Sequence, residues 1–148
     1  MKSLLGILGA LALLLAGLPT LAVAESGYAP QKVVYHFNTS DDKTIRMGLR
    51  NIQNHINAVG ADNLELKIVM HGDGVDMLRK AVEDMNLQGS VINLKTQGVA
   101  FQVCSNTLRG RSIDHREDLF DVYEEDIVPS GVAEVARLQA EGYTYLKP

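Results

Sequence analysis

The chain has 148 residues and a formal net charge of −4 at pH 7, with 14 Lys and Arg against 18 Asp and Glu. This mildly acidic composition, without a basic cluster, argues against nucleic acid or an anionic membrane as the main partner. Tryptophan is absent and aromatic residues make up only 5%, so a base-stacking surface is not expected either.

Residues 1–24 have the layout of a secretory signal peptide. Lys2 supplies a positive start, residues 4–18 are almost wholly apolar, and Ala22-Val23-Ala24 forms a small-x-small cleavage site. An uncleaved N-terminal anchor is the alternative, but Gly and Pro interrupt the short apolar run. We expect cleavage after Ala24, export to a bacterial periplasm without a stable membrane anchor, and one mature domain over residues 25–148.

The remaining chain alternates strand patterns with helix patterns. Strands are expected at 32–38, 64–70, 99–103, 127–128 and 143–146. Helices are expected from the capping region 39–42 to Val59, over 75–85, over 105–109 and from Ser130-Gly131 to Gly142, with a short helix or turn at 89–97 and one more helical turn at 114–121. This alternation predicts an α/β fold, a three-layer sandwich whose mostly parallel five-stranded sheet carries helices on both faces.

Function in such folds collects at the carboxyl ends of the strands. Four stretches are expected at that edge: 38–41, 71–74, 104–107 and 129–131. The sequence therefore predicts that the central strand-to-helix junctions meet there and form the site.

Cys104 is the strongest candidate because it is the only cysteine and stands between an apolar strand and a helix start. Unpaired backbone N–H groups and the helix dipole at such a junction favour the thiolate. Hydroxyl, amide and guanidinium groups that could hold an anion or a bound sulfur follow at Ser105, Asn106, Thr107, Arg109 and Arg111. The alternative is a structural cysteine that ends a buried strand.

The histidines carry weaker signals. His71 follows a strand and precedes Gly72, so it is a candidate general base or ligand, although it could merely cap a turn. His36 lies within the first strand, where we expect a half-buried ring satisfied by a neighbour. His55 and His115 lie on polar stretches and are expected to be solvated.

Several other sites are not indicated. The chain has no phosphate loop, no G-x-S-x-G elbow and no zinc-type ligand spacing. Met70, Met77 and Met85 are expected to fill the core, and residues 124–126 to form an exposed acidic loop. A metal or haem held by Cys104 would need His71 and His36 as further ligands.

Three segments taken together resemble the exported branch of the DsrE/DsrF-like family. They are Gly98-Val99-x-Phe101-x-Val103-Cys104-x-Asn106-Thr107-Leu108, Val128-Pro129-Ser130-Gly131-Val132-x-Glu134 and Leu138-Gln139-x-x-Gly142-Tyr143-x-Tyr145-x-Lys147-Pro148. The resemblance implies a flavodoxin-like sandwich without flavin, assembled as a homotrimer or homohexamer. In the cytoplasmic sulfur-relay members, a cysteine after the corresponding strand carries a persulfide, and the matching position here is Cys104.

The expected function is therefore a periplasmic sulfur carrier or sulfurtransferase of sulfur metabolism that needs no cofactor and no metal. Cys104 and His71 would be the catalytic residues, and a sulfur donor or acceptor protein of the periplasm would be the partner. The expected substrate-binding residues are Gly72, Ser105, Asn106, Thr107, Arg109 and Ser130. The alternative is a non-catalytic oligomeric binding module in which the cysteine is structural.

Overall fold

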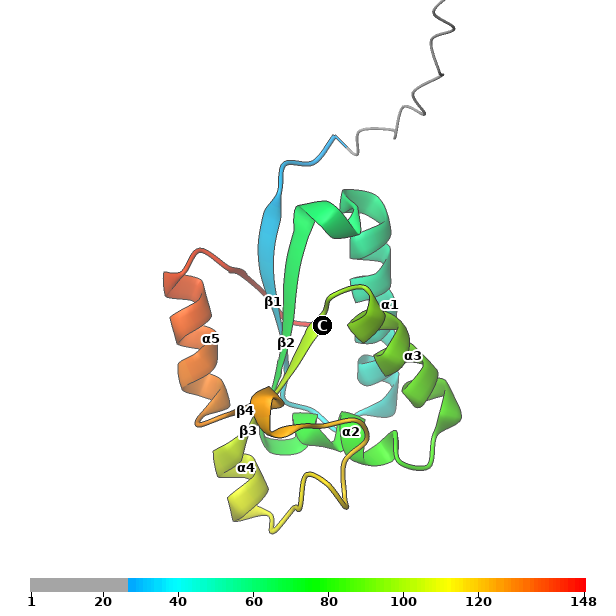
Figure 1. Ribbon diagram of the computed structural model, residues 1–148, viewed down its shortest axis with the longest axis vertical. Helices are drawn as coiled ribbons and strands as arrows, with labels where there is room; N and C mark the ends of the chain where they lie inside the picture. Colours follow the sequence, from blue (N-terminus) through cyan, green and yellow to red (C-terminus); the bar gives the residue numbers. More distant parts are fainter. Residues whose placement is uncertain (1–26) are drawn as a thin grey trace, which may run out of the picture.

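A fully parallel five-stranded sheet forms the centre of the computed structural model, which describes residues 27–148 (Figure 1). The expected signal peptide lies outside the described residues. The strands are β1 (Gln31–Phe37), β2 (Leu64–Met70), β3 (Ala100–Cys104), β4 (Ile127–Val128) and β5 (Thr144–Leu146). Their order is β4-β3-β2-β1-β5, and every neighbouring pair is parallel. The predicted α/β class and parallel pairing are thus confirmed, with β2 as the central strand and β3 beside it.

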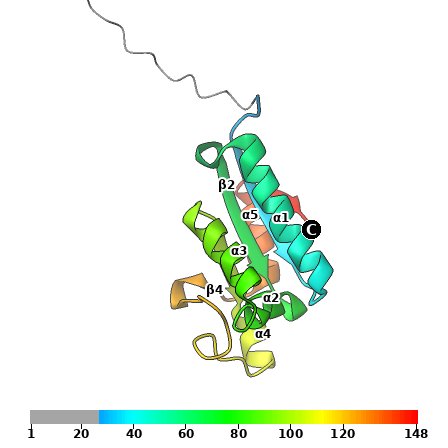
Figure 2. The same cartoon turned by 90° about the vertical axis from the view of Figure 1, so that its right-hand side faces the viewer.

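Helices cover both faces of the sheet, as predicted. α1 (Asp42–Val59), α2 (Asp76–Lys80) and α3 (Met85–Thr96) lie on one face, and α5 (Gly131–Ala140) lies on the other (Figures 1 and 2). The short α4 (Ser105–Gly110) continues directly from β3. Three 3₁₀ turns complete the chain: η1 (Ala61–Asn63), η2 (Gly72–Val75) and η3 (Glu124–Asp126).

The bounds of α1 follow from its capping residues. The Asp41 carboxylate accepts a hydrogen bond from the Thr44 backbone N–H at 2.7 Å, which satisfies one of the free donors of the first turn. Gly60 ends the helix at φ +89°, a conformation that an L side chain rarely adopts. Both ends agree with the prediction.

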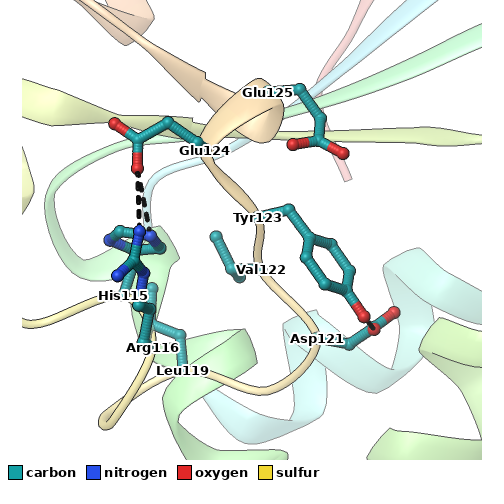
Figure 3. Close-up of a pocket in the computed structure, with 8 residues that line it drawn as sticks. All are labelled: His115, Arg116, Leu119, Asp121, Val122, Tyr123, Glu124 and Glu125. Carbon is teal, nitrogen blue, oxygen red and sulfur yellow. Dashed lines mark hydrogen bonds and ion pairs between the residues drawn. The ribbon is translucent and has the colours of Figure 1, made fainter.

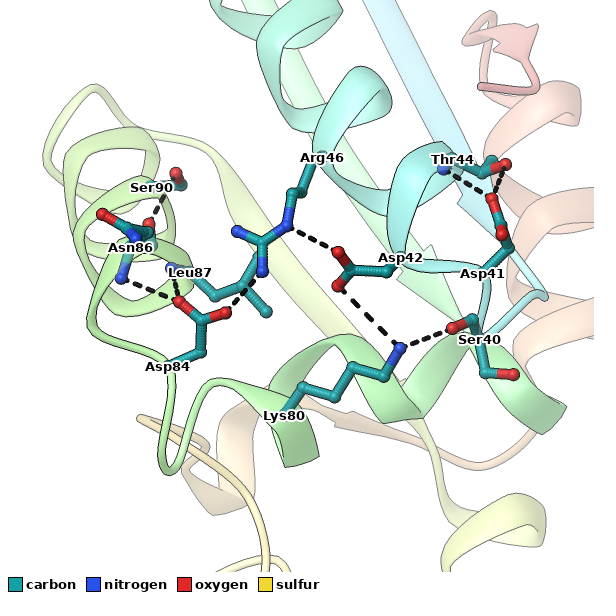
Figure 4. A network of polar contacts seen from close by, with 10 residues as sticks. All are labelled: Ser40, Asp41, Asp42, Thr44, Arg46, Lys80, Asp84, Asn86, Leu87 and Ser90. Atoms are coloured by element: carbon teal, nitrogen blue, oxygen red, sulfur yellow. Dashed lines mark hydrogen bonds and ion pairs between the residues drawn. The ribbon is translucent and has the colours of Figure 1, made fainter.

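The second helical region differs from the prediction because Asp84 starts a new helix. Its carboxylate accepts from the N–H groups of Asn86 and Leu87 and also binds Arg46 of α1 (Figure 4). The predicted helix over 75–85 therefore ends at Lys80, and α3 begins at Met85 instead of the predicted 89. Met85 is 82% exposed, so its expected place in the core is wrong.

Residues 114–121 form turns and no helix. Asp118 accepts from the Asp114 N–H at 2.9 Å, and Asp114 accepts from the Arg116 N–H at 2.9 Å. Side chains here satisfy backbone donors locally, which competes with helix formation. The expected helical turn is therefore wrong.

The core is divided unequally between the two faces. The larger apolar cluster fills the space between the sheet and the α1–α3 side. The smaller cluster, under α5, consists of Val34, Val69, Val135, Leu138 and Tyr143. Within residues 27–148, no helix combines the length and apolarity needed to cross a bilayer.

Candidate functional site

Three side chains form a row at the carboxyl edge of the sheet, on the face covered by α5. His36 lies near the end of β1, His71 directly follows β2, and Cys104 ends β3. Successive residues of a strand point to opposite faces, and the neighbours Phe37, Met70 and Val103 belong to the core of the other face. Met70 pairs with Val103, so the residues that follow them, His71 and Cys104, are adjacent in register.

Gly131 brings α5 into contact with this row. A Cβ at this position would lie 2.9 Å from the Cβ of His71 and 3.3 Å from the Cβ of Cys104. Only a residue without a side chain lets the first turn of α5 approach so closely. Segments 71–74, 104–107 and 129–131 thus converge at one edge, as the sequence predicts.

Several N–H and O–H groups surround the Cys104 sulfur, although the residue is only 4% exposed. Burial raises the pKa of the thiol, but the nearby Gly131 N–H, the hydroxyl and N–H of Thr107 and the Asn106 N–H favour the thiolate and lower it. The balance leaves the pKa of Cys104 below its ordinary value of 9.0. The amino ends of two helices, α4 and α5, thus favour the thiolate.

Thr107 connects the turn after β2 to the sulfur. Its hydroxyl oxygen accepts a hydrogen bond from the Gly72 N–H at 2.8 Å, which leaves the hydroxyl proton for Cys104. Gly72 has φ +54° and so favours glycine at this place. Arg111 donates to the Gly72 carbonyl at 3.0 Å and to Asp76 at 2.7 Å, so its guanidinium braces this turn.

The other predicted polar residues lie around the row, and their side chains bind one another or the backbone. Arg109 donates to the Ser105 hydroxyl at 2.9 Å and to the side-chain carbonyl of Asn106, along the surface of α4. The Ser130 hydroxyl accepts from the Ala133 N–H at 3.4 Å and caps α5. Among Ser105, Asn106, Arg109 and Ser130, only Asn106 influences the sulfur, and it does so through its backbone N–H.

A stacked histidine pair is the feature that sequence reasoning missed. The rings of His36 and His71 are 4.7 Å apart between centroids and inclined by 25°. His36 Nδ1 lies 2.9 Å from the hydroxyl of Tyr145, while Nε2 is buried without a partner. The expectation that a neighbour satisfies His36 is therefore correct for one nitrogen. Strand alternation could have placed both rings on one face, but Tyr145 depends on a strand order that the sequence does not reveal.

His71 differs from its stacking partner in being open to a ligand. Its ring nitrogens make no hydrogen bond within residues 27–148. A pocket of about 240 Å³ lies on the other side of the pair, lined by His36, Lys147 and residues after β1. The row can therefore offer a thiolate, an imidazole and an adjacent polar space to a small molecule.

The remaining two histidines do not meet expectation. His55 is partly buried and lies 3.1 Å from the Tyr35 hydroxyl and 2.8 Å from Gln31. His115 packs in the loop before β4, 3.4 Å from Glu124, at the wall of a separate pocket of about 430 Å³ (Figure 3). Both were expected to be solvated, but each ring is partly buried and lies beside a polar side chain.

Metal binding by Cys104 would require a cluster of further ligands. Within residues 27–148, the structure brings together no group of three or more His, Cys, Asp and Glu side chains that could hold an ion.

Known proteins give two kinds of similarity. A model of the DsrE/DsrF-like family matches residues 31–148. The protein of unknown function MTH1491 from Methanobacterium thermoautotrophicum is 33% identical, with 80% of this chain and 99% of that chain covered and a TM-score of 0.69. The ychN protein from E. coli is 22% identical with the same coverage and a TM-score of 0.62, which shows a shared fold. No curated protein matches the sequence.

The family match covers all five strands and the junction that carries Cys104. The structural match to MTH1491 covers nearly the whole of that protein. Sequence and fold therefore agree that this chain belongs to the DsrE/DsrF-like family.

Proposed function

We propose that this protein is an exported sulfur carrier that holds sulfane sulfur as a persulfide on Cys104. The observation that carries the proposal is the ring of hydrogen-bond donors around the Cys104 sulfur, which lowers the pKa of the thiol in spite of its burial. A thiolate at neutral pH is the form that attacks sulfane sulfur. Membership of a family that includes persulfide carriers supports the same reading.

The transfer step needs no cofactor. The Cys104 thiolate attacks the outer sulfur of a donor persulfide, a new S–S bond forms, and the S–S bond of the donor breaks. The electron pair of that bond leaves with the donor thiolate, so no net oxidation occurs. The departing thiolate takes up a proton, and His71 is the group beside Cys104 whose ring nitrogens are free to supply it.

The surrounding residues have supporting roles in this proposal. The backbone of Asn106, the hydroxyl of Thr107 and the first turn of α5 stabilise negative charge on sulfur. Gly72 positions the Thr107 hydroxyl, and Ser130 caps the helix that supplies the Gly131 N–H. Ser105 and Arg109 lie at the rim, where a partner protein would approach.

The small exposed fraction of Cys104 favours a second candidate function. A cysteine with 4% exposure also suits a non-catalytic, oligomeric binding module in which the thiol is structural. In that case the pocket of about 240 Å³ beside His36 would hold the ligand.

Intact-mass measurement separates the two candidates. Reduced protein is incubated with sodium polysulfide, and we expect a gain of one sulfur that dithiothreitol removes and that Cys104→Ser abolishes. Absence of this adduct, together with slow alkylation of Cys104 at neutral pH, would contradict sulfur transfer and favour the binding module. His55→Gln, far from the row, is a control that keeps the adduct.

Location and assembly are also part of the proposal. In this proposal residues 1–24 are removed on export to the periplasm, so protein from the periplasmic fraction should begin at Glu25 on N-terminal sequencing. Light scattering on the mature chain should give the mass of a homotrimer or homohexamer. A protein donor or acceptor of sulfur would then be sought in the same compartment.

A further inference from the structure

The His36 ring is held in a setting that suits only its neutral form. Nδ1 has one partner, the Tyr145 hydroxyl at 2.9 Å, and Nε2 is buried with none. In the neutral ring one nitrogen carries a proton and the other accepts. A second proton would leave a charged ring with an unpaired N–H in a buried position, which is costly.

Two basic side chains beside His36 oppose its protonation. His71 stacks on it from the end of β2, and Lys147 approaches it from the residues after β5. Cys104 and Gly131 lie beyond His71, while Glu134 of α5 is directed to Gln102 and Arg137. Within residues 27–148, no carboxylate bonds to either ring.

Burial, followed by His71 and Lys147, lowers the pKa of His36 below its ordinary value of 6.5. His36 therefore stays neutral near pH 7 and takes up its second proton only in acid. When it does, the charged His36 ring is repelled by Lys147 and carries an unpaired N–H in a buried place, so the stack loses its support.

We propose that His36 is a positioning residue: as a neutral ring it holds His71 beside Cys104, and its protonation in acid releases His71 from that position. The inference rests on the proposed sulfur transfer, in which His71 gives a proton to the departing thiolate. It adds that Tyr145 and His36, on the far side of His71 from the sulfur, control whether that proton can be delivered.

Two rates measured side by side isolate this effect. Alkylation of Cys104 by iodoacetamide reports thiolate content and access, because iodide leaves without a proton. Sulfur uptake from a small-molecule persulfide reports the same properties and also proton delivery. The ratio of uptake to alkylation should fall about tenfold for each pH unit below the pKa of His36 in the wild type.

Variants at position 36 test the cause. His36→Phe keeps an aromatic ring against His71 but cannot be protonated, so its ratio should stay flat in acid. His36→Ala removes the ring, so its ratio should be low at every pH. His55→Gln, on the other face of the sheet, should follow the wild type. An acid fall in His36→Phe equal to that of the wild type would overturn the inference.

NMR titration of the wild type provides a measurement that needs no variant and no sulfur transfer. The His36 ring should titrate below pH 6.5, and the ring-current shifts of His71 should change together with it. A stack that persists through the protonation of His36 would refute the positioning role. If the stack is lost in acid but Cys104 never takes up sulfur, the release of His71 stands and only the proposed function is rejected.

Discussion

The lowered pKa of Cys104 depends on a single side-chain hydroxyl and on several backbone groups. Thr107 accepts a hydrogen bond from the Gly72 N–H at 2.8 Å, and its hydroxyl is one of the groups near the sulfur that lower the Cys104 pKa. A hydrogen bond to a charged group contributes roughly 1.5–3 kcal/mol in a partly buried place. A single substitution of Thr107 should therefore change the pKa of Cys104 while the thiol itself is kept.

Replacement of Thr107 by Val should raise the Cys104 pKa, because the hydroxyl donor is lost while the burial remains. A rise of about one unit would reduce the thiolate fraction near pH 7 roughly tenfold. Thiolate absorbance recorded against pH gives the pKa directly. Thr107→Ser retains the hydroxyl and should stay close to the wild type, and an unchanged pKa in Thr107→Val would exclude this hydroxyl as a cause.

Residue positions in the site were predictable to the extent that strand alternation determines them. Cys104 ends one strand and His71 follows another, and both strands have a clear apolar pattern, so the edge and face of the two residues are implied by sequence. The contact of His36 with Tyr145 spans 109 positions along the chain. It arises from β5 pairing with β1, which no local pattern encodes.

The element that completes the site is α5, and polar side chains attach it to the sheet. Glu134, which is buried, accepts from Gln102 of β3 at 3.0 Å and from Arg137 at 2.7 and 2.8 Å. The Arg137 hydrogen bonds are the main cause that lowers the pKa of Glu134 below its ordinary value of 4.5, burial opposes them, and Gln102 assists. The charged carboxylate is thus the form that the folded protein stabilises.

Substitution of Glu134 by Gln should destabilise the fold in a pH-dependent way. The folded pKa lies below the unfolded one, so the contribution is fully present above about pH 4.5 and is lost as the pH falls through the lower folded value. We expect a loss of about 1–2 kcal/mol in the free energy of unfolding at pH 7 and a smaller loss at pH 3. Urea unfolding at both pH values measures it, and an equal loss at both would contradict the ionic role.

Two glycines in helices should respond to alanine in opposite ways. Gly131→Ala would force α5 away from His71 and Cys104, so the free energy of unfolding should fall by about 1–3 kcal/mol and the Cys104 pKa should rise. Gly89, exposed within α3, has open space around its Cα, so Gly89→Ala should add about 0.5–1 kcal/mol. Thermal unfolding and thiolate absorbance distinguish the two, and a stabilised Gly131→Ala would refute the close approach.

The extents of the elements were predictable where capping residues and apolar stripes agree, as in α1 between Asp41 and Gly60. They were not predictable where a capping residue starts a new helix within a continuous pattern of apolar residues. Val82 and Met85 continue the apolar spacing of the preceding helix, yet both are exposed because Asp84 caps a new helix and binds Arg46. A tertiary ion pair decided that boundary, and the sequence alone does not show it.

The two faces of the sheet differ in the amount of apolar packing, which is extensive on the α1–α3 face and small on the α5 face. α1 to α3 cover the larger apolar cluster, whereas the apolar cluster under α5 has only five members. Local opening takes its lowest-energy route through the least-buried unit. The route that uncovers Cys104 should therefore be a movement of α5.

Two leucine truncations of similar burial test this asymmetry. Leu138 in α5 and Leu94 in α3 are 0% and 1% exposed, so each Leu→Ala change should lower the free energy of unfolding by about 2–5 kcal/mol. Only Leu138→Ala should accelerate the alkylation of Cys104 in the native state, by roughly tenfold or more for about 1.4 kcal/mol of local destabilisation. Equal acceleration in both variants would indicate that global unfolding exposes the thiol.

The strand order also determines when the site can form. β4 and β5, the last two strands along the chain, become the two opposite edges of the sheet, and α5 crosses between them. One edge of β1 pairs with β2, but its other edge must wait for a partner that is about a hundred residues distant, and such long-range pairing is slow to close. The histidine row gains its Tyr145 contact only with this closure, so a tyrosine signal at position 145 would report the last event of folding and the first appearance of a complete site.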